Sequence, residues 1–359
     1  MKFVALCTSG LEGAVCKELK RMGFKILKVT AGHVHFFGQM SDVPKLNLTL
    51  RSAERVLIEM AEFEAKTFDD LFDGTFSASW QDLIHSRATL VIEKVKVRNS
   101  KLSATGAVAS VVKKAIYEKI GSKNDPDGTI YPLYVYLKND TVSLLLDTTG
   151  PRALSKRGYR LKTSTAPLRE TIAAGLIIVS DWDEQKLLLD PFCGSGTICI
   201  EAARMALGIL NDKRTFAFQS WPIFADVKMT IHSFGGTKNK MQRIALGFDR
   251  DPSMVRIARE NAVRASVAGS VEFSCKRFEE LEGFKNVHVI TNPPYGIRLK
   301  EIDRNFLAKL AKLLDKFADS KICVLSPADL ERILKIKASK KLRFQNSGIW
   351  TWYYIFEPA

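Results

Sequence analysis

In three short segments, an apolar run is directly followed by glycines or by residues with an acidic or amide side chain. They are LLLDPFCGSGTICIEAA (residues 187–203), LGFDRDPSMVRIARENAVRAS (246–266) and VITNPPYGIRL (289–299). In the first segment, a strand is expected to end at Asp190 and a helix to begin near Thr197. The glycines between them let the backbone approach a ligand closely, and the amide groups at the helix start are exposed to it. A tight turn without a ligand would also use these glycines.

Two well-known phosphate-binding patterns do not fit this loop. A P-loop needs a lysine after its second glycine, and none follows Gly196. A dinucleotide-binding fingerprint needs a third glycine, and Cys199 stands at that position.

The second segment places an acid at a strand end. An acid like Asp249, after the second strand of a nucleotide-binding sheet, can accept hydrogen bonds from ribose hydroxyls. Asp251 is better suited to cap the helix that is expected to start around Pro252-Ser253.

The third segment ends a strand in Asn292-Pro293-Pro294-Tyr295. Because neither proline has an N–H, the Pro293 carbonyl stays available, and it can accept from one NH2 group together with the Asn292 amide oxygen. The Tyr295 ring can stack on a flat base, a contact worth roughly 1–3 kcal/mol. Two acceptors would draw the nitrogen lone pair out of conjugation and aim it at an electrophilic methyl group. The alternative interpretation is a rigid loop.

The elements around these segments are those of a parallel sheet. Short apolar strands alternate with longer, partly helical stretches, which is typical of a sheet covered on both faces. The expected strands are residues 187–189, 244–248, 271–274, 287–291, 321–325 and 350–356.

The first half of the chain is expected to be α+β. Strands at 3–6, 25–30, 34–37 and 56–63, with helices at 11–22 and 43–50, predict a ferredoxin-like arrangement. From about residue 65 a second module is expected, with helices at 68–73 and 104–120, a strand at 88–97, and a hairpin of 131–138 and 141–147 that turns at Asn139-Asp140. This module holds no catalytic constellation, so a binding role is favoured.

Net charge and cysteine usage indicate which kinds of partner and metal the protein would bind. The formal net charge of +15 favours an anionic polymer such as nucleic acid. Six cysteines without a CxxC pair and five scattered histidines predict no metal site and a reduced, cytoplasmic protein. No apolar stretch is long enough to span a membrane, and the first residues do not resemble a signal peptide.

Positive charge is concentrated in two stretches. Residues 87–123 hold nine Lys/Arg and two Glu, and residues 152–162 hold five Lys/Arg and no acid, with Gly158 and Tyr159 interleaved. Phosphate contact is the favoured interpretation, and a solvated surface is the alternative. The predicted RNA-binding residues are Lys94, Lys96, Arg98, Lys101, Lys113, Lys114, Arg157 and Arg160.

In this order and spacing, DPFCGSGT, GFDRDP and NPPY resemble a class I (Rossmann-like) amino-methyltransferase. Segments of the first half, among them LCTSGLEGAVCKEL, NLTLRSAERVLIEMAEF and RNSKLSATGAVASVVKKAI, resemble the THUMP-domain RNA methyltransferases, as do RALSKRGYR and APLRETIAAGLI. The most similar group is the guanine-N2 methyltransferase half of the bacterial large-subunit rRNA methyltransferases, with its single-domain relatives. The match covers nearly the whole chain.

The resemblance implies S-adenosylmethionine as cofactor. By position, Asp190, Phe192, Gly194 and Gly196 would line its methionine part and Asp249 would hold its ribose. The full predicted cofactor set is Asp190, Phe192, Cys193, Gly194, Ser195, Gly196, Thr197, Asp249, Arg250, Phe278 and Asn292. The predicted catalytic set, which would hold the guanine amino group, is Asn292, Pro293, Pro294 and Tyr295.

One position departs from the family pattern. After the third strand the family usually has an acid that meets the adenine amino group, and Arg277 stands there. An arginine cannot accept a hydrogen bond. Either Glu279 substitutes, or Phe278 and the backbone hold the adenine.

The resulting prediction is a four-part chain. A ferredoxin-like region (1–64), a THUMP domain (65–150) and a basic linker (151–167) would precede a Rossmann-like methyltransferase domain (168–359). The predicted activity is formation of N2-methylguanosine in RNA, with 23S rRNA favoured over tRNA as the partner. A DNA adenine-N6 methyltransferase and a catalytically silent RNA-binding protein remain alternatives, and the oligomeric state stays open.

Overall fold

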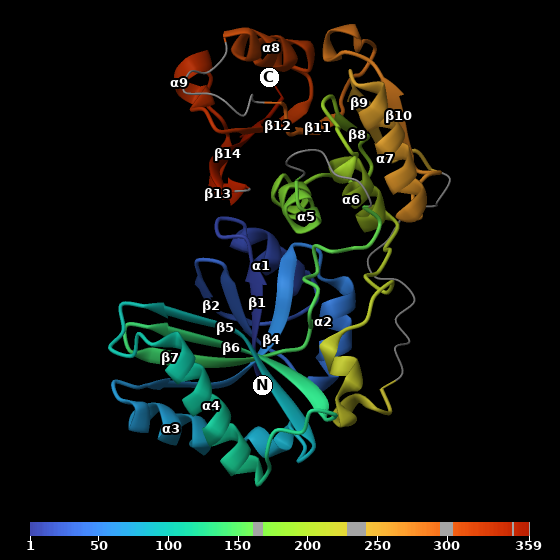
Figure 1. Cartoon of the computed structure of the whole chain (residues 1–359). Helices are drawn as coiled ribbons and strands as arrows, with labels where there is room; N and C mark the ends of the chain where they lie inside the picture. The colour runs from blue at the N-terminus through green and yellow to red at the C-terminus, as the bar shows by residue number, and fades with distance from the viewer. Residues whose placement is uncertain (161–167, 228–241, 295–303, 347, 359) are drawn as a thin grey trace. The chain divides into compact units, whose positions relative to one another are not determined.

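A computed structural model describes residues 1–160, 168–227, 242–294, 304–346 and 348–358 (Figure 1). The chain forms two compact units. The first unit contains Met1–Leu6, Leu19–Leu154 and Arg214–Ile231. The second contains Cys7–Glu18, Ser155–Lys213 and His232–Ala359. No helix among the described residues is long and apolar enough to cross a membrane.

The first unit is built on one seven-stranded sheet with strand order β2-β3-β1-β4-β7-β6-β5. Its strands are β1 (Lys2–Cys7), β2 (Ile26–Thr30), β3 (His33–Phe37), β4 (Ala53–Glu64), β5 (Ala88–Arg98), β6 (Thr129–Lys138) and β7 (Thr141–Asp147). Its helices are α2 (Val43–Thr49), α3 (Phe68–Ser77) and α4 (Thr105–Ile120), while α1 (Glu12–Arg21) is divided between the two units. The predicted ferredoxin-like region and the following module therefore share a single sheet.

Local sequence signals explain several boundaries in this unit. Thr67 caps α3 by accepting a hydrogen bond from the amide of Asp70, and the Asp70 carboxylate bonds back to the Thr67 amide. The β6–β7 hairpin turns at Asn139 and Asp140, whose φ angles are +51° and +59°. Two successive residues of positive φ match the twist of a tight hairpin, and Asn and Asp tolerate that conformation. The predicted turn is confirmed.

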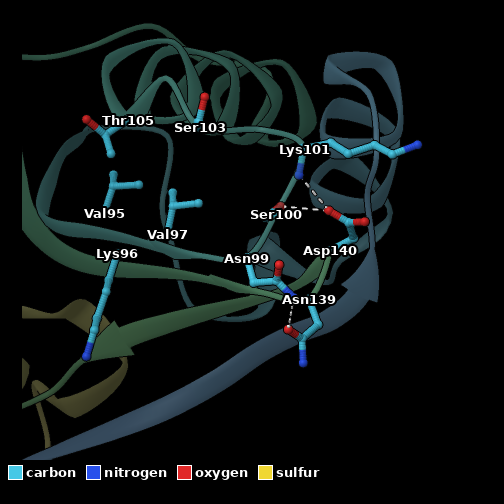
Figure 2. A pocket seen from close by; sticks show the side chains of 10 residues that line it. All are labelled: Val95, Lys96, Val97, Asn99, Ser100, Lys101, Ser103, Thr105, Asn139 and Asp140. Carbon is cyan, nitrogen blue, oxygen red and sulfur yellow. Dashed lines mark hydrogen bonds between the residues drawn. The ribbon is translucent and has the colours of Figure 1, made fainter.

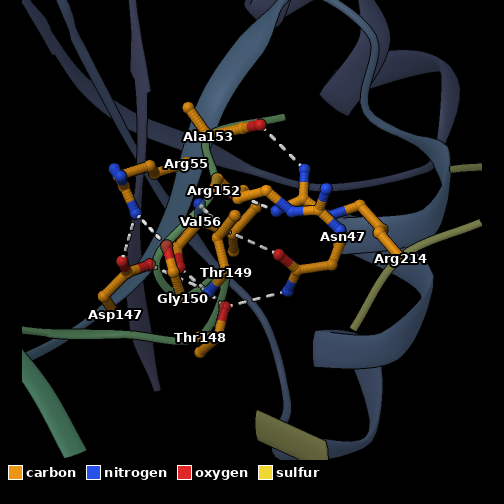
Figure 3. A network of polar contacts seen from close by, with 10 residues as sticks. All are labelled: Asn47, Arg55, Val56, Asp147, Thr148, Thr149, Gly150, Arg152, Ala153 and Arg214. Atoms are coloured by element: carbon orange, nitrogen blue, oxygen red, sulfur yellow. Dashed lines mark hydrogen bonds and ion pairs between the residues drawn. The ribbon is translucent and has the colours of Figure 1, made fainter. Parts of the chain in front are cut away.

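A buried polar network ties residues 147–153 and Arg214 into the first unit (Figure 3). The Asn47 amide donates to Thr148 Oγ1 at 2.8 Å and accepts from Thr149 Oγ1 at 2.7 Å. Arg214 NH1 donates to the Ala153 carbonyl at 2.8 Å. These hydrogen bonds offset much of the cost of burying the polar groups, and they hold the segment after Arg214 in the first unit.

The second unit contains the predicted parallel sheet, with strand order β10-β9-β8-β11-β12-β14-β13. Its strands are β8 (Leu188–Asp190), β9 (Ala245–Asp249), β10 (Val271–Cys275), β11 (His288–Thr291), β12 (Lys321–Ser326), β13 (Lys340–Asn346) and β14 (Ile349–Phe356). Its helices are α5 (Glu170–Val179), α6 (Thr197–Ala206), α7 (Pro252–Arg264), α8 (Arg304–Lys316) and α9 (Leu330–Leu334). Strands β8 to β12 pair in parallel, whereas β14 runs antiparallel to β12 and β13.

Both faces of this sheet are covered by helices, as the apolar strands predict. Leu176 of α5, Ile200 of α6 and Ala258 of α7 belong to one buried cluster with sheet residues such as Ile290. Leu313 of α8 belongs to a second cluster, with residues such as Val289, on the other face. The helices α5 and α6 pack against each other.

Candidate active site

The three predicted segments meet at the carboxyl edge of the second unit's sheet. Asp190 ends β8, Asp249 ends β9 and Thr291 ends β11. Strand β8 lies between β9 and β11, so the chain leaves β8 toward one side of the sheet and later returns to its other side. Such a reversal of strand order opens a crevice at the carboxyl ends, where open α/β sheets bind ligands.

Asp190 joins two strand ends at this edge. Its side chain is 2% exposed and accepts hydrogen bonds from Thr291 Oγ1 at 2.7 Å and from the Phe192 amide at 3.1 Å. Burial raises the pKa of Asp190 to about 7, and the neighbouring charge of Asp249 adds to this rise. The side chain therefore fixes the start of the glycine loop against the end of β11.

The glycine loop is shaped by backbone conformation and close packing. Gly194 and Gly196 have φ angles of +50° and +80°, which side-chain-bearing residues rarely adopt. A Cβ atom on Gly196 would lie 2.6 Å from Cζ of Phe273, whereas one on Gly194 would meet no atom within 4 Å. Gly196 is therefore required by packing, and Gly194 borders open space.

Asp249 is oriented by backbone amides. Its two carboxylate oxygens accept from the amides of Gly194 and Asp251, each at 2.9 Å. The side chain is half-buried and each oxygen keeps a lone pair for a further donor. Asp251 caps α7 by accepting from the Ser253 amide at 2.8 Å, which confirms the predicted cap.

Two aromatic rings lie beside the loop. Phe192 and Phe278 have ring centroids 5.4 Å apart, and Phe278 is 3% exposed. Arg277 and Glu279 are exposed on either side of Phe278. Both alternatives for the adenine edge therefore stay open.

The remaining predicted cofactor residues surround the same loop. Cys193, Ser195 and Thr197 are buried, and Arg250 is exposed. The Cys193 amide donates to the Phe248 carbonyl at 2.8 Å, and the Ser195 carbonyl accepts from the Asn261 side chain at 3.0 Å. These contacts join the loop to β9 and α7.

The predicted catalytic residues directly follow β11. Asn292 is half-buried, Pro293 is buried and Pro294 is exposed. Tyr295 lies outside the described residues. Since Asn292 comes immediately after Thr291, it lies at the same sheet edge as Asp190 and Asp249.

The prediction that Arg157 and Arg160 contact RNA is wrong. The side chain of Arg157 is fully buried and pairs with Glu201 at 3.4 Å, and Tyr159 is 2% exposed and donates to the same carboxylate at 3.0 Å. Arg160 NH2 donates to Thr197 Oγ1 at 2.8 Å, and its side chain is 9% exposed. A buried charge needs an opposite charge or several hydrogen bonds, and α6 supplies Glu201 to Arg157 while α5 supplies Glu170 to Arg160 at 3.7 Å.

Glu201 was missed by the sequence analysis although it organises this part of the site. It lies on α6, one helical turn after the cofactor loop, and is fully buried. The segment Ser155–Lys213, which contains both arginines, belongs to the second unit. Its positive charge therefore helps to hold the start of α6 and is not displayed to solvent at Arg157 and Arg160.

The predicted RNA-binding residues of the first unit are solvent-accessible. Lys94, Lys96, Arg98, Lys101 and Lys114 are exposed, and Lys113 is partly so. Strand β5 is the last strand of its sheet, and charged side chains on such an edge also discourage pairing with another chain.

A cavity of about 880 Å³ lies beside this strand (Figure 2). Lys96 and Lys101 are among its lining residues. The Lys101 amide and Ser100 Oγ both donate to Asp140 Oδ1, at 2.7 and 2.9 Å, which fixes the loop after β5. Figure 2 shows the Lys96 side chain on the opposite side of β5 from Val95 and Val97, and the Lys101 side chain pointing away from the constrained loop.

The fold and this edge together define a class I methyltransferase. Comparison with family models agrees: residues 157–347 match the RMKL-like methyltransferase domain, residues 2–57 the RlmL ferredoxin-like domain, and residues 65–147 the THUMP domain. The chain belongs to the RMKL-like methyltransferases that carry a THUMP domain. The resemblance predicted from the motifs is confirmed, and with it the class of S-adenosylmethionine-dependent methyltransferases.

Individual relatives extend over the whole chain. The Bacillus subtilis protein named "Putative RNA methyltransferase YpsC" is 32% identical over 98% of this chain and 94% of its own length. The ribosomal RNA large subunit methyltransferase K/L of Colwellia psychrerythraea is 31% identical over 97% of this chain, which spans only 52% of that relative. The crystal structure of SMU.472 complexed with S-adenosylhomocysteine has a TM-score of 0.90 and 32% identity, covering 100% of this chain and 98% of SMU.472.

Proposed function

We propose that this protein transfers a methyl group to the exocyclic N2 of a guanine in RNA. The observation that carries the proposal is the position of Asn292. It follows β11 at the sheet edge where Thr291 is hydrogen-bonded to Asp190, the residue that begins the glycine loop. An amide oxygen beside a cofactor loop can hold an amino group within reach of a methyl donor.

The residues of the loop fit S-adenosylmethionine. Open space borders Gly194, and Asp249 offers oriented carboxylate oxygens for ribose hydroxyls. The partly exposed Phe192, which packs against the buried Phe278, provides an apolar surface. When bound, the donor supplies a methyl group on a positively charged sulfur.

The chain's own residues would position the nucleophile. Asn292 Oδ1 and the Pro293 carbonyl accept the two hydrogens of the guanine amino group, which turns the nitrogen lone pair away from the ring. The new N–C bond forms as the S–C bond breaks, and the proton leaves for solvent after transfer. Positioning and oriented dipoles supply the acceleration, so no strong base is required beside Asn292.

RNA is the favoured substrate because of the protein's positive charge and the names of its relatives. The net charge is +15, and Lys96 and Lys101 line the cavity beside β5. The relatives named K/L act, by name, on large-subunit ribosomal RNA, so 23S rRNA is the proposed target and tRNA the alternative. The target base must be flipped or unpaired to reach the edge of the sheet, and the reaction would occur in the cytoplasm.

The test is a labelled-methyl assay on rRNA, tRNA and DNA side by side, followed by mass spectrometry of the nucleosides. We expect label in N2-methylguanosine from RNA alone. Asn292→Ala should lower kcat by about 100-fold or more, because an oriented polar contact to the reacting group is lost, while calorimetry gives unchanged S-adenosylmethionine affinity. Gln185→Ala, which removes an exposed amide of the same unit, is the matched control and should behave as the wild type.

Three results would contradict the proposal. Label only in DNA adenine would identify the adenine-N6 alternative. Absence of S-adenosylmethionine binding would favour a silent RNA-binding protein, for which Arg277 is the motivation. Normal methylation by Asn292→Ala would remove the assigned role of the amide.

A further inference from the structure

Two tryptophans lie on an exposed hairpin at the edge of the second unit's sheet. The hairpin consists of β13 and β14, and β13 is the last strand in the order. Trp350 is 51% exposed and Trp352 is partly buried. Isolated exposed apolar residues are common, but an exposed tryptophan beside a second one is a large flat surface that needs an explanation.

Cationic side chains hold these rings from the neighbouring strand. The guanidinium of Arg343 lies 4.7 Å from the ring centroid of Trp350 and 5.2 Å from that of Trp352. Lys341 Nζ lies 5.4 Å from the centroid of Trp352 and also pairs with Glu331. Arg343 is directly opposite Trp352 in the hairpin register, so these side chains share one face of the two strands. We call Trp350, Trp352 and Arg343 the tryptophan platform.

Strand register places this platform at the catalytic edge. Thr291 of β11 pairs with Val324 of β12, and Ser326, two residues further along β12, pairs with Trp352 of β14. Strand β14 runs antiparallel to β12, so Trp350 lies beyond Trp352 in the direction of the carboxyl ends of β11 and β12. Asn292 follows the carboxyl end of β11. Only β12 separates β11 from β14, a distance of roughly 10 Å between strand axes.

We propose that the tryptophan platform binds an unpaired base of the RNA that flanks the methylated guanine. This inference rests on the proposed function, because it assumes RNA at the edge marked by Asn292. A base drawn out of its stack leaves its neighbours without stacking partners, and an aromatic ring offers every base a replacement irrespective of sequence. The exposed Arg343 brings positive charge for an adjoining phosphate, whereas Lys341 pairs with Glu331.

Charge and position favour RNA over a protein partner for this surface. Arginine and tryptophan together are also common at protein interfaces. A protein partner would not, however, explain why the platform lies at the same sheet edge as Asn292, on a chain of net charge +15. Association with a protein, including a second copy of this chain, is therefore an outcome that the test must detect.

The test compares the full-length wild type with Trp350→Ala, Trp350→Phe and Ile349→Ala. Ile349 is the matched control, since it is the neighbouring residue and 48% exposed. The probes are a labelled 12-nucleotide single-stranded RNA and an RNA duplex of the same composition. For Trp350→Ala, we expect affinity for the single strand to fall about 5- to 150-fold, the range for losing one stacked base. Trp350→Phe and Ile349→Ala should stay within about threefold of wild type, and duplex binding should change little.

The outcomes separate this inference from the proposed function. Wild-type protein that methylates RNA, with Trp350→Ala binding the single strand equally well, overturns the platform and leaves the proposed function intact. Wild-type protein that neither binds nor methylates any RNA overturns both. Unchanged RNA affinity with an altered sedimentation coefficient for Trp350→Ala identifies a protein interface and overturns the platform.

A second variant keeps the test decisive if Trp350→Ala folds poorly. Arg343→Gln removes the charge between the two rings while leaving both tryptophans in place. Reduced single-strand affinity of Arg343→Gln, with a melting temperature close to wild type, supports the platform. Unchanged affinity of this variant contradicts it.

Discussion

Replacing Asp190 by asparagine should make the second unit less sensitive to alkaline pH. The carboxyl group is buried, and Thr291 Oγ1 and the Phe192 amide both donate hydrogen bonds to its Oδ1. An asparagine has nearly the same shape and its Oδ1 can accept the same two bonds. The substitution therefore removes the titration while keeping the contacts that hold the loop to β11.

The size and sign of the effect follow from the pKa of Asp190. Its pKa of about 7 in the folded protein lies above the value of 3.8 for an unperturbed aspartic acid. The stability linked to this group is thus fully present below pH 4 and is lost as the pH rises through 7, because the unfolded chain releases a proton that the folded chain retains. The full gap corresponds to about 4 kcal/mol, of which about 3 kcal/mol is lost between pH 5 and pH 8.5.

The assay is urea unfolding of wild type and Asp190→Asn at pH 5 and pH 8.5, followed by circular dichroism. All other titrating groups are common to both proteins, so the difference between the two free energies of unfolding isolates Asp190. Between pH 5 and pH 8.5, the free energy of unfolding of the variant should gain about 3 kcal/mol relative to that of the wild type. A constant offset, within about 0.5 kcal/mol, would refute the buried-carboxyl argument. Thr291→Val should shift the loss to still higher pH, since a hydrogen bond that stabilises the carboxylate is removed.

Two further predictions concern the glycine loop and the edge strand of the first unit. Gly196→Ala should destabilise the protein by about 2 kcal/mol or more, because the added Cβ would overlap the Phe273 ring. Gly194→Ala should cost about 1 kcal/mol of backbone strain, and its main effect should be weaker S-adenosylmethionine binding. Unfolding curves and calorimetry check this pair, and equal cofactor affinity of Gly194→Ala and wild type would contradict it. Lys96→Gln should reduce the salt dependence of RNA affinity by roughly 0.7–0.9 in the log–log slope, as for one lost phosphate contact. An unchanged slope would leave Lys96 only a role in protecting the sheet edge.

The strand ends of the second unit could be predicted because local patterns determine them. Apolar runs followed by Asp190, Asp249 or Asn292 mark where a strand gives way to a loop, and Asp251 before a proline marks a helix start. Parallel strands then bring their carboxyl ends to one edge. The placement of the site therefore followed from short-range signals and one rule of topology.

The burial of Arg157 and Arg160 could not be predicted in the same way. Within residues 152–162 every charged side chain is positive, and the acid that pairs with Arg157 is Glu201, 44 residues further along. A local sequence window cannot distinguish a solvated basic surface from one paired by a distant helix. The helix α5 was missed for a related reason: all its residues are buried, so it shows no polar face.

Residues Cys7–Glu18 belong to the second unit but are synthesised before all its other residues, which start at Ser155. Leu11 and Ala14 share a buried cluster with Ile177 and Tyr353, and Lys17 donates to Asp181 at 2.5 Å. At a ribosomal rate of 5–20 residues per second, the roughly 340 residues between Leu11 and Tyr353 take about 17 to 70 seconds to emerge. During that time the apolar side chains of residues 7–18 are exposed, and chaperones can bind them. The catalytic unit can therefore complete its core only after Tyr353 has been synthesised, and a fragment starting at residue 155 would lack part of that core.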